Sequence, residues 1–318
     1  MRLRRSTLLD SAQGQYFHVT SRVVDRRFIF GDVEKQVFLK IMRQLEGFTG
    51  VQVASYCLMS NHFHLIVYVP VRPESLPEKE VLKRMKSLYS SDQMAQFHEY
   101  LKELESASTQ VLREAFFEKF RARMFHLSHF CRELKLRFSK YYNSRNDRKG
   151  TLWEERFKCS LIEGHSNALM NTAAYIELNP VRAGIVNDPK DYRWCSYTEA
   201  VAGSPNARIG IIILASGMNN PLTYKEAVKR YREFYLYRSF SQQGSRKGVE
   251  NAEADLSNTD TAFIRMRYFL DGVVLGTREF VEGWYNKHSA DLNRNRARIS
   301  NKVKASGMEG LHTYRNVG

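Results

Sequence analysis

Apolar and polar side chains alternate in three short runs near the start of the chain, and one longer run between them has a helical period. Residues 15–24 are rich in aromatic and β-branched side chains, which predicts a strand. An apolar stripe over 32–45 predicts a helix, with the aspartate at its start as the N-cap. Runs over 51–59 and 62–69 flank a tight turn at Ser60 and Asn61, so we expect an antiparallel hairpin there.

The pattern changes after a proline-rich stretch that follows this hairpin. Residues 79–142 are highly charged and lack strand patterns, which predicts a long helical insertion. Residues 153–162 alternate weakly and predict another strand, and 165–178 predict a helix that ends before Pro180. This order of elements is not the regular alternation of a doubly wound fold. We therefore expect an α+β domain in which an antiparallel sheet is flanked by helices.

The C-terminal third carries no motif that we can connect to chemistry. Residues 201–260 predict a helical extension that ends in a polar linker at 241–260, where Gly, Ser and Asn are frequent. Beyond the linker, the patterns over 261–288 and 290–305 predict helices of a small basic C-terminal module at 261–318. We expect the chemistry to lie in the segments that precede the linker.

The chain of 318 residues carries 49 Lys and Arg against 34 Asp and Glu, which gives a formal charge of +15. Such an excess favours a polyanionic partner such as nucleic acid, because neutralising phosphates releases counterions. A solvated basic surface explains the charge equally well. Charge therefore narrows the choice of partner without deciding it.

The cysteines and the apolar runs indicate where the protein works. The 4 cysteines are scattered and form no CxxC pair, which argues against a zinc ribbon or a disulfide scaffold and fits a reducing compartment. No apolar run approaches the length of a membrane span, and the N-terminus lacks the pattern of a signal peptide. We expect a cytoplasmic protein without a membrane partner, associated with the nucleoid when it is bound to DNA.

Two histidines, His62 and His64, lie two positions apart on the strand expected over 62–69. Side chains at i and i+2 point to the same face of a strand, so the imidazoles project together while Phe63 turns into the core. Two convergent imidazoles form part of a divalent-metal site. Ordinary histidines packed on a sheet are the commoner meaning of such a pair, but spare imidazoles on a buried strand would be costly.

Tyr175 and Asn179 are four residues apart on the helix expected near them, so they lie one turn apart on one face. Ala168 and Thr172 continue this stripe with small side chains that leave space around the phenol. A half-buried tyrosine that bridges core and solvent is the commoner use of such a residue, and an asparagine before Pro180 also suits a helix end. The spacing alone leaves both meanings open.

Together these segments resemble the REP-associated tyrosine transposases, which are single-tyrosine HUH transposases of the IS200-like family. The sequence HFH is similar to the HUH motif, in which U is a bulky apolar residue, and YIELNPVRAG is similar to the tyrosine-bearing helix. YFHVTSR, LMSNHFHLIV and LWEERFK also match in order, so the resemblance covers residues 14–200. It implies a ferredoxin-like HUH domain, usually a homodimer, that acts on single-stranded DNA next to hairpins.

The resemblance also implies roles for individual residues. His62 and His64 fall on the metal-binding histidines, Asn179 falls on the third metal ligand, and Tyr175 falls on the nucleophile. Mixed imidazole and oxygen ligation suits Mg²⁺ or Mn²⁺ as the cofactor. We expect a metal-dependent transposase that nicks and rejoins single-stranded, hairpin-associated DNA. Its expected products are a 5′-phosphotyrosine and a free 3′-hydroxyl, which permits strand transfer without ATP.

Two features of the sequence depart from the family pattern, and one residue near Tyr175 needs separate comment. Val23 stands where the family usually has a glycine, and the stretch over 88–128 is longer than the usual connection. These departures concern loop geometry and hairpin recognition rather than the catalytic residues. Glu177 is expected to point away from Tyr175, as a surface residue and not as a base.

Single-stranded DNA requires stacking aromatic rings and cations along a groove. Tyr141 and Tyr142 are also possible nucleophiles, but neither has an amide at helical spacing near the histidines. The candidates for DNA binding are aromatic and basic: Tyr141, Tyr142, Arg145, Arg148, Lys149, Arg156, Lys158 and Arg182.

Two other functions fit the same residues. A catalytically silent DNA-binding protein that recognises repeat hairpins would use the same scaffold, although such a protein need not keep the full set of His62, His64, Tyr175 and Asn179. A metal-dependent nuclease that activates water would need the metal site but not the tyrosine. Substitution of Tyr175 separates these possibilities.

Overall fold

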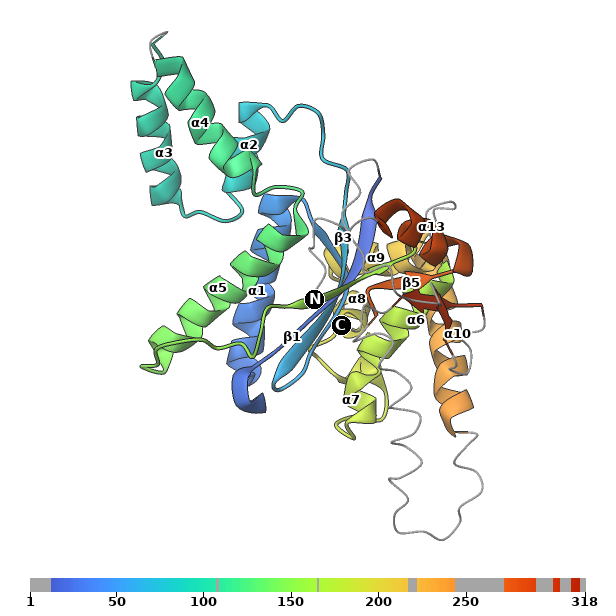
Figure 1. Cartoon of the computed structure of the whole chain (residues 1–318). Helices are drawn as coiled ribbons and strands as arrows, with labels where there is room; N and C mark the ends of the chain where they lie inside the picture. The colour runs from blue at the N-terminus through green and yellow to red at the C-terminus, as the bar shows by residue number, and fades with distance from the viewer. Residues whose placement is uncertain are drawn as a thin grey trace.

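A computed structural model of the chain describes residues 13–106, 109–164, 166–216, 222–243, 272–289, 300–303 and 310–314. Its strands are β1 (Gln15–Arg22), β2 (Gln52–Leu58), β3 (His62–Val69), β4 (Lys158–Ile162), β5 (Val274–Gly276), β6 (Asn301–Lys302) and β7 (His312–Tyr314). They form a 7-stranded sheet in the order β2-β3-β1-β4-β5-β7-β6. The predicted α+β fold with a helix-flanked sheet is confirmed (Figure 1).

The centre of the sheet is built from the segments whose alternation predicts strands. β1 lies between β3 and β4 and pairs antiparallel with both. β2 pairs with β3 in the predicted antiparallel hairpin. The strand predicted over 153–162 is shorter in the structure, because Trp153 makes only an isolated bridge with Val23 and the ladder begins at Lys158.

Helices cover both faces of this sheet. α1 and α5 pack together on one face, while α6, α8 and α9 lie against β2 on the other and α10 packs on α9.

No helix in the described ranges combines the length and apolar character that a membrane crossing requires. The helices are α1 (Asp32–Thr49), α2 (Glu78–Met85), α3 (Ser91–Glu103), α4 (Gln110–Arg121), α5 (Leu127–Arg145), α6 (Ser166–Glu177), α7 (Asn179–Arg182), α8 (Ser196–Val201), α9 (Pro205–Ser216), α10 (Tyr224–Gln243) and α13 (Arg278–His288).

Aromatic side chains hold α1 and α5 on their face of the sheet. Phe63 of β3 is 1% exposed and its ring centroid lies 4.9 Å from that of Phe38 on α1. Phe138 of α5 stacks on Phe30 at 4.8 Å, and Trp153 closes the cluster 5.6 Å from Phe63. Such packing combines burial of large apolar area with preferred ring geometries. It fixes β3 so that the residues flanking Phe63 face the opposite side.

The start of α1 differs from the prediction. Gly31 is the N-cap, and Asp32 is the first residue of the helix itself. The Asp32 carboxylate accepts a hydrogen bond from Trp194 Nε1 at 3.0 Å, so it connects α1 to the segment before α8. In the first turn, its negative charge still interacts favourably with the helix dipole.

The helical insertion predicted over 79–142 is confirmed by α2, α3, α4 and α5. α2, α3 and α4 form a lobe that projects from the sheet at the upper left of Figure 1. Its small core includes edge-to-face contacts of Phe97 with Tyr89 and Phe120, at 5.2 and 5.7 Å. This lobe accounts for most of the stretch over 88–128.

The sequence patterns predicted a purely helical C-terminal module, which is wrong. The helix predicted over 261–288 contains β5 at Val274–Gly276, and its last part is α13. β5 pairs parallel with β4, and β7 and β6 then extend the same sheet by antiparallel pairing. The helix predicted over 290–305 is wrong at Asn301–Lys302, which form β6, and its first part lies outside the described residues. The linker predicted over 241–260 also lies outside them, except for its first three residues, which end α10.

One glycine allows α9 to lie close to β2. A Cβ built on Gly210 would lie 2.3 Å from the carbonyl oxygen of Ala54 and 3.2 Å from its Cα, so backbone would have to move. We expect Gly210→Ala to lower the free energy of unfolding by about 1–3 kcal/mol, as overpacking does in tight cores. Urea unfolding of the variant measures this loss.

The matched control is Gly283→Ala in α13, where nothing lies within 4 Å of the added Cβ. There the same substitution should stabilise the helix by about 0.5–1 kcal/mol, because alanine has the higher helix propensity. Equal effects of the two substitutions would contradict the close approach of α9 to β2.

Candidate active site

The histidines of β3 project from the face of the sheet that α6 covers. His62 lies opposite Arg22 of β1, and His64 lies opposite Thr20. The imidazole centroids are 5.1 Å apart with an interplanar angle of 88°. The two rings are therefore close enough to bind one ion, with Phe63 between them buried on the other face.

A hydrogen bond fixes the tautomer of His62. Its Nδ1 lies 2.7 Å from Oδ1 of Asn61, whose own Nδ2 donates to the carbonyl oxygen of Arg26 at 3.0 Å. Asn61 Oδ1 is thus an acceptor, so His62 Nδ1 carries the proton. The lone pair of His62 lies on Nε2, which is the arrangement of a metal-binding imidazole.

His64 is held by a third histidine that the sequence analysis missed. Its Nδ1 lies 3.0 Å from Nε2 of His18 on β1, and the side chains are 3% and 2% exposed. His18 shares a face with Thr20, so strand pairing brings it beside His64. Its only sequence signal was its alternation with Val19 in the YFHVTSR strand, which could not identify its neighbour.

The surroundings keep both histidines of β3 uncharged at neutral pH. Burial, with a smaller contribution from the nearby Arg22, lowers the pKa of His62 to about 4. Burial also lowers the pKa of His64 well below its usual range, with His62 and His18 adding to the effect. Neutral imidazole is the form that donates a lone pair to a metal.

Tyr175 of α6 lies over His64 and His18. Its ring centroid is 5.8 Å from that of His64 and 6.2 Å from that of His18, in edge-to-face contacts with both. The tyrosine is 9% exposed. The guanidinium of Arg182 on α7 lies 4.4 Å from the centre of the phenol ring and donates to the Tyr175 carbonyl oxygen. The structure thus brings a phenol, a cation and imidazoles together from segments far apart in sequence.

Asn179 begins α7, one residue after a break in the helix at Leu178. Its Nδ2 donates to the carbonyl oxygens of Tyr175 and Ile176, both at 3.0 Å. Because these bonds occupy both amide hydrogens, Oδ1 is the atom left to act as a ligand. In the described part of the chain no three His, Cys, Asp or Glu side chains gather as metal ligands. The Asn179 amide oxygen is a donor of a different kind, outside this set of side chains.

Glu177 is not the surface residue that the sequence indicated. It is 0% exposed, and its Oε1 accepts hydrogen bonds from Ser55 of β2 at 3.0 Å and Ser196 of α8 at 2.5 Å. Burial raises the pKa of this carboxyl to about 7. The prediction failed because the sequence patterns did not show that α8 and α10 would cover this side of α6.

The backbone at Val23 has an ordinary extended conformation, which does not require glycine. Val23 has φ −72° and ψ 143°, is buried, and donates its N–H to the carbonyl oxygen of Asn61 at 2.9 Å. The left-handed positions of this loop are instead Asp25 and Arg26, with φ of 56° and 53°. The departure from the family pattern therefore leaves the strand end and the hairpin turn connected.

Three of the predicted DNA-binding residues lie in α7, in β4 or in the segment that leads into β4. Arg182 contacts Tyr175, as described above. Lys158 opens β4 opposite Thr20, which in turn lies opposite His64, so the three residues form a row across the sheet. Arg156 is exposed just before this strand.

The remaining predicted residues belong to α5 and the loop after it, on the other face of the sheet. Tyr141 and Tyr142 are half-buried against Phe138, with ring centroids 6.2 and 6.4 Å away. The structure thus places them on a different helix from Tyr175, and their use as DNA contacts stays a prediction. Arg145 ends α5, Arg148 donates to Asn143 Oδ1 at 3.3 Å, and Lys149 is exposed in the loop.

Comparisons with known proteins give a family model that matches part of the chain and a solved structure of low similarity. Residues 11–110, which include β1 and the histidines of β3, match the family model described as IS200-like transposase. No curated protein matches the chain. It is similar, with a TM-score of 0.40 and 14% identity, to a solved structure of a REP-associated tyrosine transposase bound to a REP hairpin, over 65% of this chain and 90% of that chain. Over residues 11–110 the chain is therefore similar to the IS200-like transposases, as its motifs indicated.

Proposed function

We propose that this protein is a transposase-type enzyme that nicks and rejoins single-stranded, hairpin-associated DNA with Tyr175 as its nucleophile. The observation that carries the proposal is the position of the phenol over His64, 5.8 Å from ring to ring. The family match over residues 11–110 supports a transposase. The solved structure named above contains a REP hairpin, and we propose the same class of DNA here. The homodimer implied by the resemblance stays a prediction.

We further propose that His62 and His64, through their Nε2 atoms, and Asn179, through Oδ1, hold a divalent cation. Mg²⁺ and Mn²⁺ suit this mixed set of nitrogen and oxygen donors. When bound, such an ion polarises the scissile phosphate and stabilises the leaving oxygen. The protein contributes two neutral imidazoles whose orientations are already fixed by Asn61 and His18.

The chemistry assigned to the chain's own residues is a transesterification. The phenol oxygen of Tyr175 attacks phosphorus in line with the 3′ oxygen and loses its proton as the new O–P bond forms. The bond between phosphorus and the 3′ oxygen breaks, and that oxygen leaves as a hydroxyl after taking up a proton. The positive charge of Arg182 near the ring stabilises the negative charge that develops on the phenol oxygen and the phosphate. Attack of a 3′-hydroxyl on the phosphotyrosine reverses these steps without ATP.

The polarity of the covalent product tests this function. A single-stranded oligonucleotide that carries a hairpin from the DNA flanking the gene is labelled at either end and incubated with Mn²⁺ or Mg²⁺. On a denaturing protein gel the 3′-labelled strand should migrate with the protein, whereas the 5′-labelled strand should be released with a free 3′-hydroxyl. Chelation of the metal should prevent both products. A 5′ label that stays attached to the protein would contradict the assignment.

The contact between His18 and His64 leads to a prediction about metal affinity. His18→Ala should weaken Mn²⁺ binding by about 10–100-fold, since loss of a partner that orients a liganding histidine has this effect. Calorimetric titration with Mn²⁺ measures the affinity without any DNA. The control is His98→Ala, because His98 is exposed on α3 and should not affect the ion. Equal affinities of the two variants would remove His18 from the metal site.

A further inference from the structure

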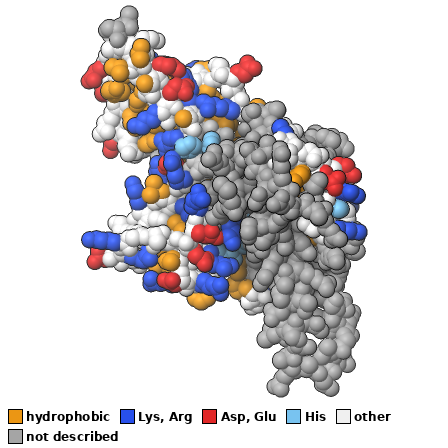
Figure 2. All heavy atoms as spheres, viewed as in Figure 1, with side chains coloured by type: hydrophobic (Ala, Val, Ile, Leu, Met, Phe, Trp, Pro, Cys, Tyr) orange, Lys and Arg blue, Asp and Glu red, His pale blue; other side chains and the backbone are white. Residues whose placement is uncertain are grey.

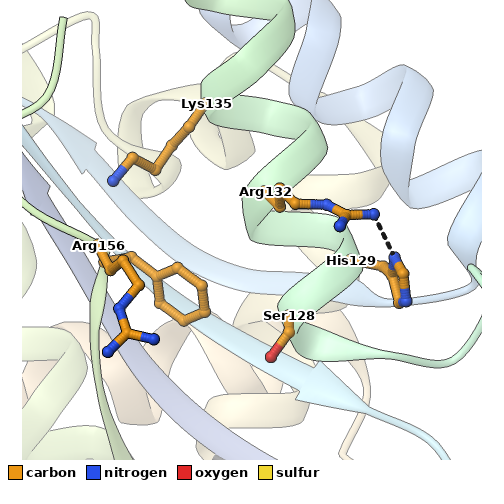
Figure 3. Close-up of a pocket in the computed structure, with 6 residues that line it drawn as sticks. Ser128, His129, Arg132, Lys135 and Arg156 are labelled. Atoms are coloured by element: carbon orange, nitrogen blue, oxygen red, sulfur yellow. Dashed lines mark hydrogen bonds between the residues drawn. The ribbon is translucent and has the colours of Figure 1, made fainter. Parts of the chain in front are cut away.

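A basic pocket of about 320 Å³ lies between α5 and the extended segment that leads into β4 (Figure 3). Among the described residues, its lining includes three cations and no acidic side chain. Figure 2 shows Lys and Arg side chains, in blue, along the surface formed by α5. The lining residues are Ser128, His129, Arg132, Lys135, Arg156 and Phe157.

The two arginines of this basic pocket form no ion pair with an acidic side chain of the described ranges. Glu133, the acid next to Arg132 in sequence, pairs instead with Arg123 at 3.4 Å and with Arg137 at 3.2 Å. Within the described ranges, neither Arg132 nor Arg156 takes part in an ion pair, and both are exposed. Concave sites with charge of one sign concentrate ions of the opposite sign.

The cationic side chains are also held in place. Lys135 Nζ donates to the carbonyl oxygen of Glu155 at 2.7 Å and lies 5.2 Å from the Trp153 ring centre. Arg132 Nη2 donates to Nδ1 of His129 at 3.0 Å, as the dashed line in Figure 3 shows. Burial lowers the pKa of His129, and the charge of Arg132 adds to this effect. His129 is therefore a neutral partner that orients the guanidinium.

The basic pocket lies beside the part of the sheet that leads to the active site. Arg156 is two residues before Lys158, whose place in the row with Thr20 and His64 is set by strand pairing. Strands are about 4.8 Å apart, so the start of β4 is about 10 Å from His64 along this row. In the described part of the sheet, Leu161 and Ile162 are the residues of β4 that pair with β5. Among the described residues, Lys158 at the start of β4 has its strand partner in β1, and a DNA strand that passes around this end of β4 connects the basic pocket with Tyr175.

We propose that the basic pocket binds a backbone phosphate of the DNA strand on which Tyr175 acts. This inference rests on the proposed function, and it adds a second contact with DNA away from the scissile phosphate. Arg132 and Arg156 supply charge-assisted hydrogen bonds to the phosphate oxygens, and Lys135 supplies a point charge. Inorganic phosphate shares this chemistry, so a test must distinguish the free ion from the DNA backbone.

The test measures how salt affects DNA binding in the absence of metal, where cleavage is not expected. Fluorescence anisotropy with the labelled hairpin oligonucleotide, over a range of KCl concentrations, compares the parent with the double variant Arg132→Gln and Arg156→Gln. The variant should bind about tenfold more weakly, and its plot of log affinity against log salt should be shallower by about one. The control, Lys79→Gln with Lys119→Gln on the lobe, removes the same charge at exposed positions and should match the parent.

Unchanged affinity and slope in the pocket variant would overturn the proposal. A thermal shift assay with inorganic phosphate gives a second contrary outcome. If phosphate stabilises the parent but not the variant, while both bind DNA equally, the pocket binds the free ion and the proposal is overturned. The covalent-adduct assay separates this inference from the proposed function. If the parent forms the adduct but the pocket variant binds DNA as the parent does, only the proposal about the pocket is overturned. Pocket-dependent binding without an adduct in the parent overturns the nucleophile and supports the pocket.

Discussion

Replacement of Tyr175 by phenylalanine should lower covalent attachment to DNA by at least about a thousandfold, because the attacking oxygen is then missing. The substitution keeps the ring that contacts His64 and His18, so the fold and the binding of DNA should persist. Arg182 also keeps its hydrogen bond to the backbone of residue 175. The measurement is the yield of protein-bound DNA on a denaturing gel, with anisotropy of the same oligonucleotide as the test of binding.

The matched control is Tyr142→Phe on α5. Tyr142 is half-buried against Phe138 on the other face of the sheet and should not affect the yield of adduct. Undiminished adduct in Tyr175→Phe would show that another residue is the nucleophile. Cleavage that persists without an adduct would instead favour a nuclease that uses water, and binding without cleavage in the parent would favour a silent DNA-binding protein.

The second large effect is expected at Glu177, whose buried carboxyl lowers the stability of the protein at neutral and alkaline pH. Burial raises the pKa of its carboxyl from 4.5 to about 7, although hydrogen bonds from Ser196, Ser55 and Tyr231 lower it. The folded state therefore holds this proton more tightly than the unfolded state. As the pH rises from about 4.5 to about 7, the group removes roughly 3 kcal/mol of stability, at about 1.36 kcal/mol per pKa unit.

Glu177→Gln should remove this loss. Glutamine cannot ionise, and its oxygen can accept the same hydrogen bonds from Ser55 and Ser196. Urea unfolding of both proteins between about pH 5 and pH 8 should show a stability difference that shifts in favour of the variant by up to about 3 kcal/mol. The other carboxylates contribute equally to the free energy of unfolding of both proteins, so their contributions cancel in this difference. A difference that does not change with pH would mean that Glu177 is ionised throughout or has an ordinary pKa.

Local patterns were sufficient for the elements that carry the histidines. Alternation predicted β3, and its period of two placed His62 and His64 on one face with Phe63 on the other. Spacing also predicted that Tyr175 and Asn179 lie one turn apart on one helix, whereas the structure places them on α6 and α7, on either side of Leu178. Spacing could not predict that α6 would lie against β3, which came from the family resemblance alone. The 5.8 Å contact between Tyr175 and His64 depends on that tertiary packing.

The features that sequence analysis missed all depend on contacts between distant segments. His18 meets His64 because β1 pairs with β3, and a single strand contains no signal for its partner. Glu177 is buried because α8 and α10 cover it, whereas its own helix gave no apolar signal at that position. The C-terminal strands β5, β6 and β7 are only two or three residues long, which is too short for an alternating pattern to identify.

Identification of the residue that carries the DNA tests the central claim most directly. The adduct is digested with nuclease and trypsin, and the remaining nucleotide is located by mass spectrometry. Cleavage after Lys158 and Arg182 gives a peptide whose single tyrosine is Tyr175. We predict a 5′-phosphate-linked nucleotide on that tyrosine. A nucleotide on the peptide that contains Tyr141 and Tyr142, or on any residue other than Tyr175, would contradict the proposed site.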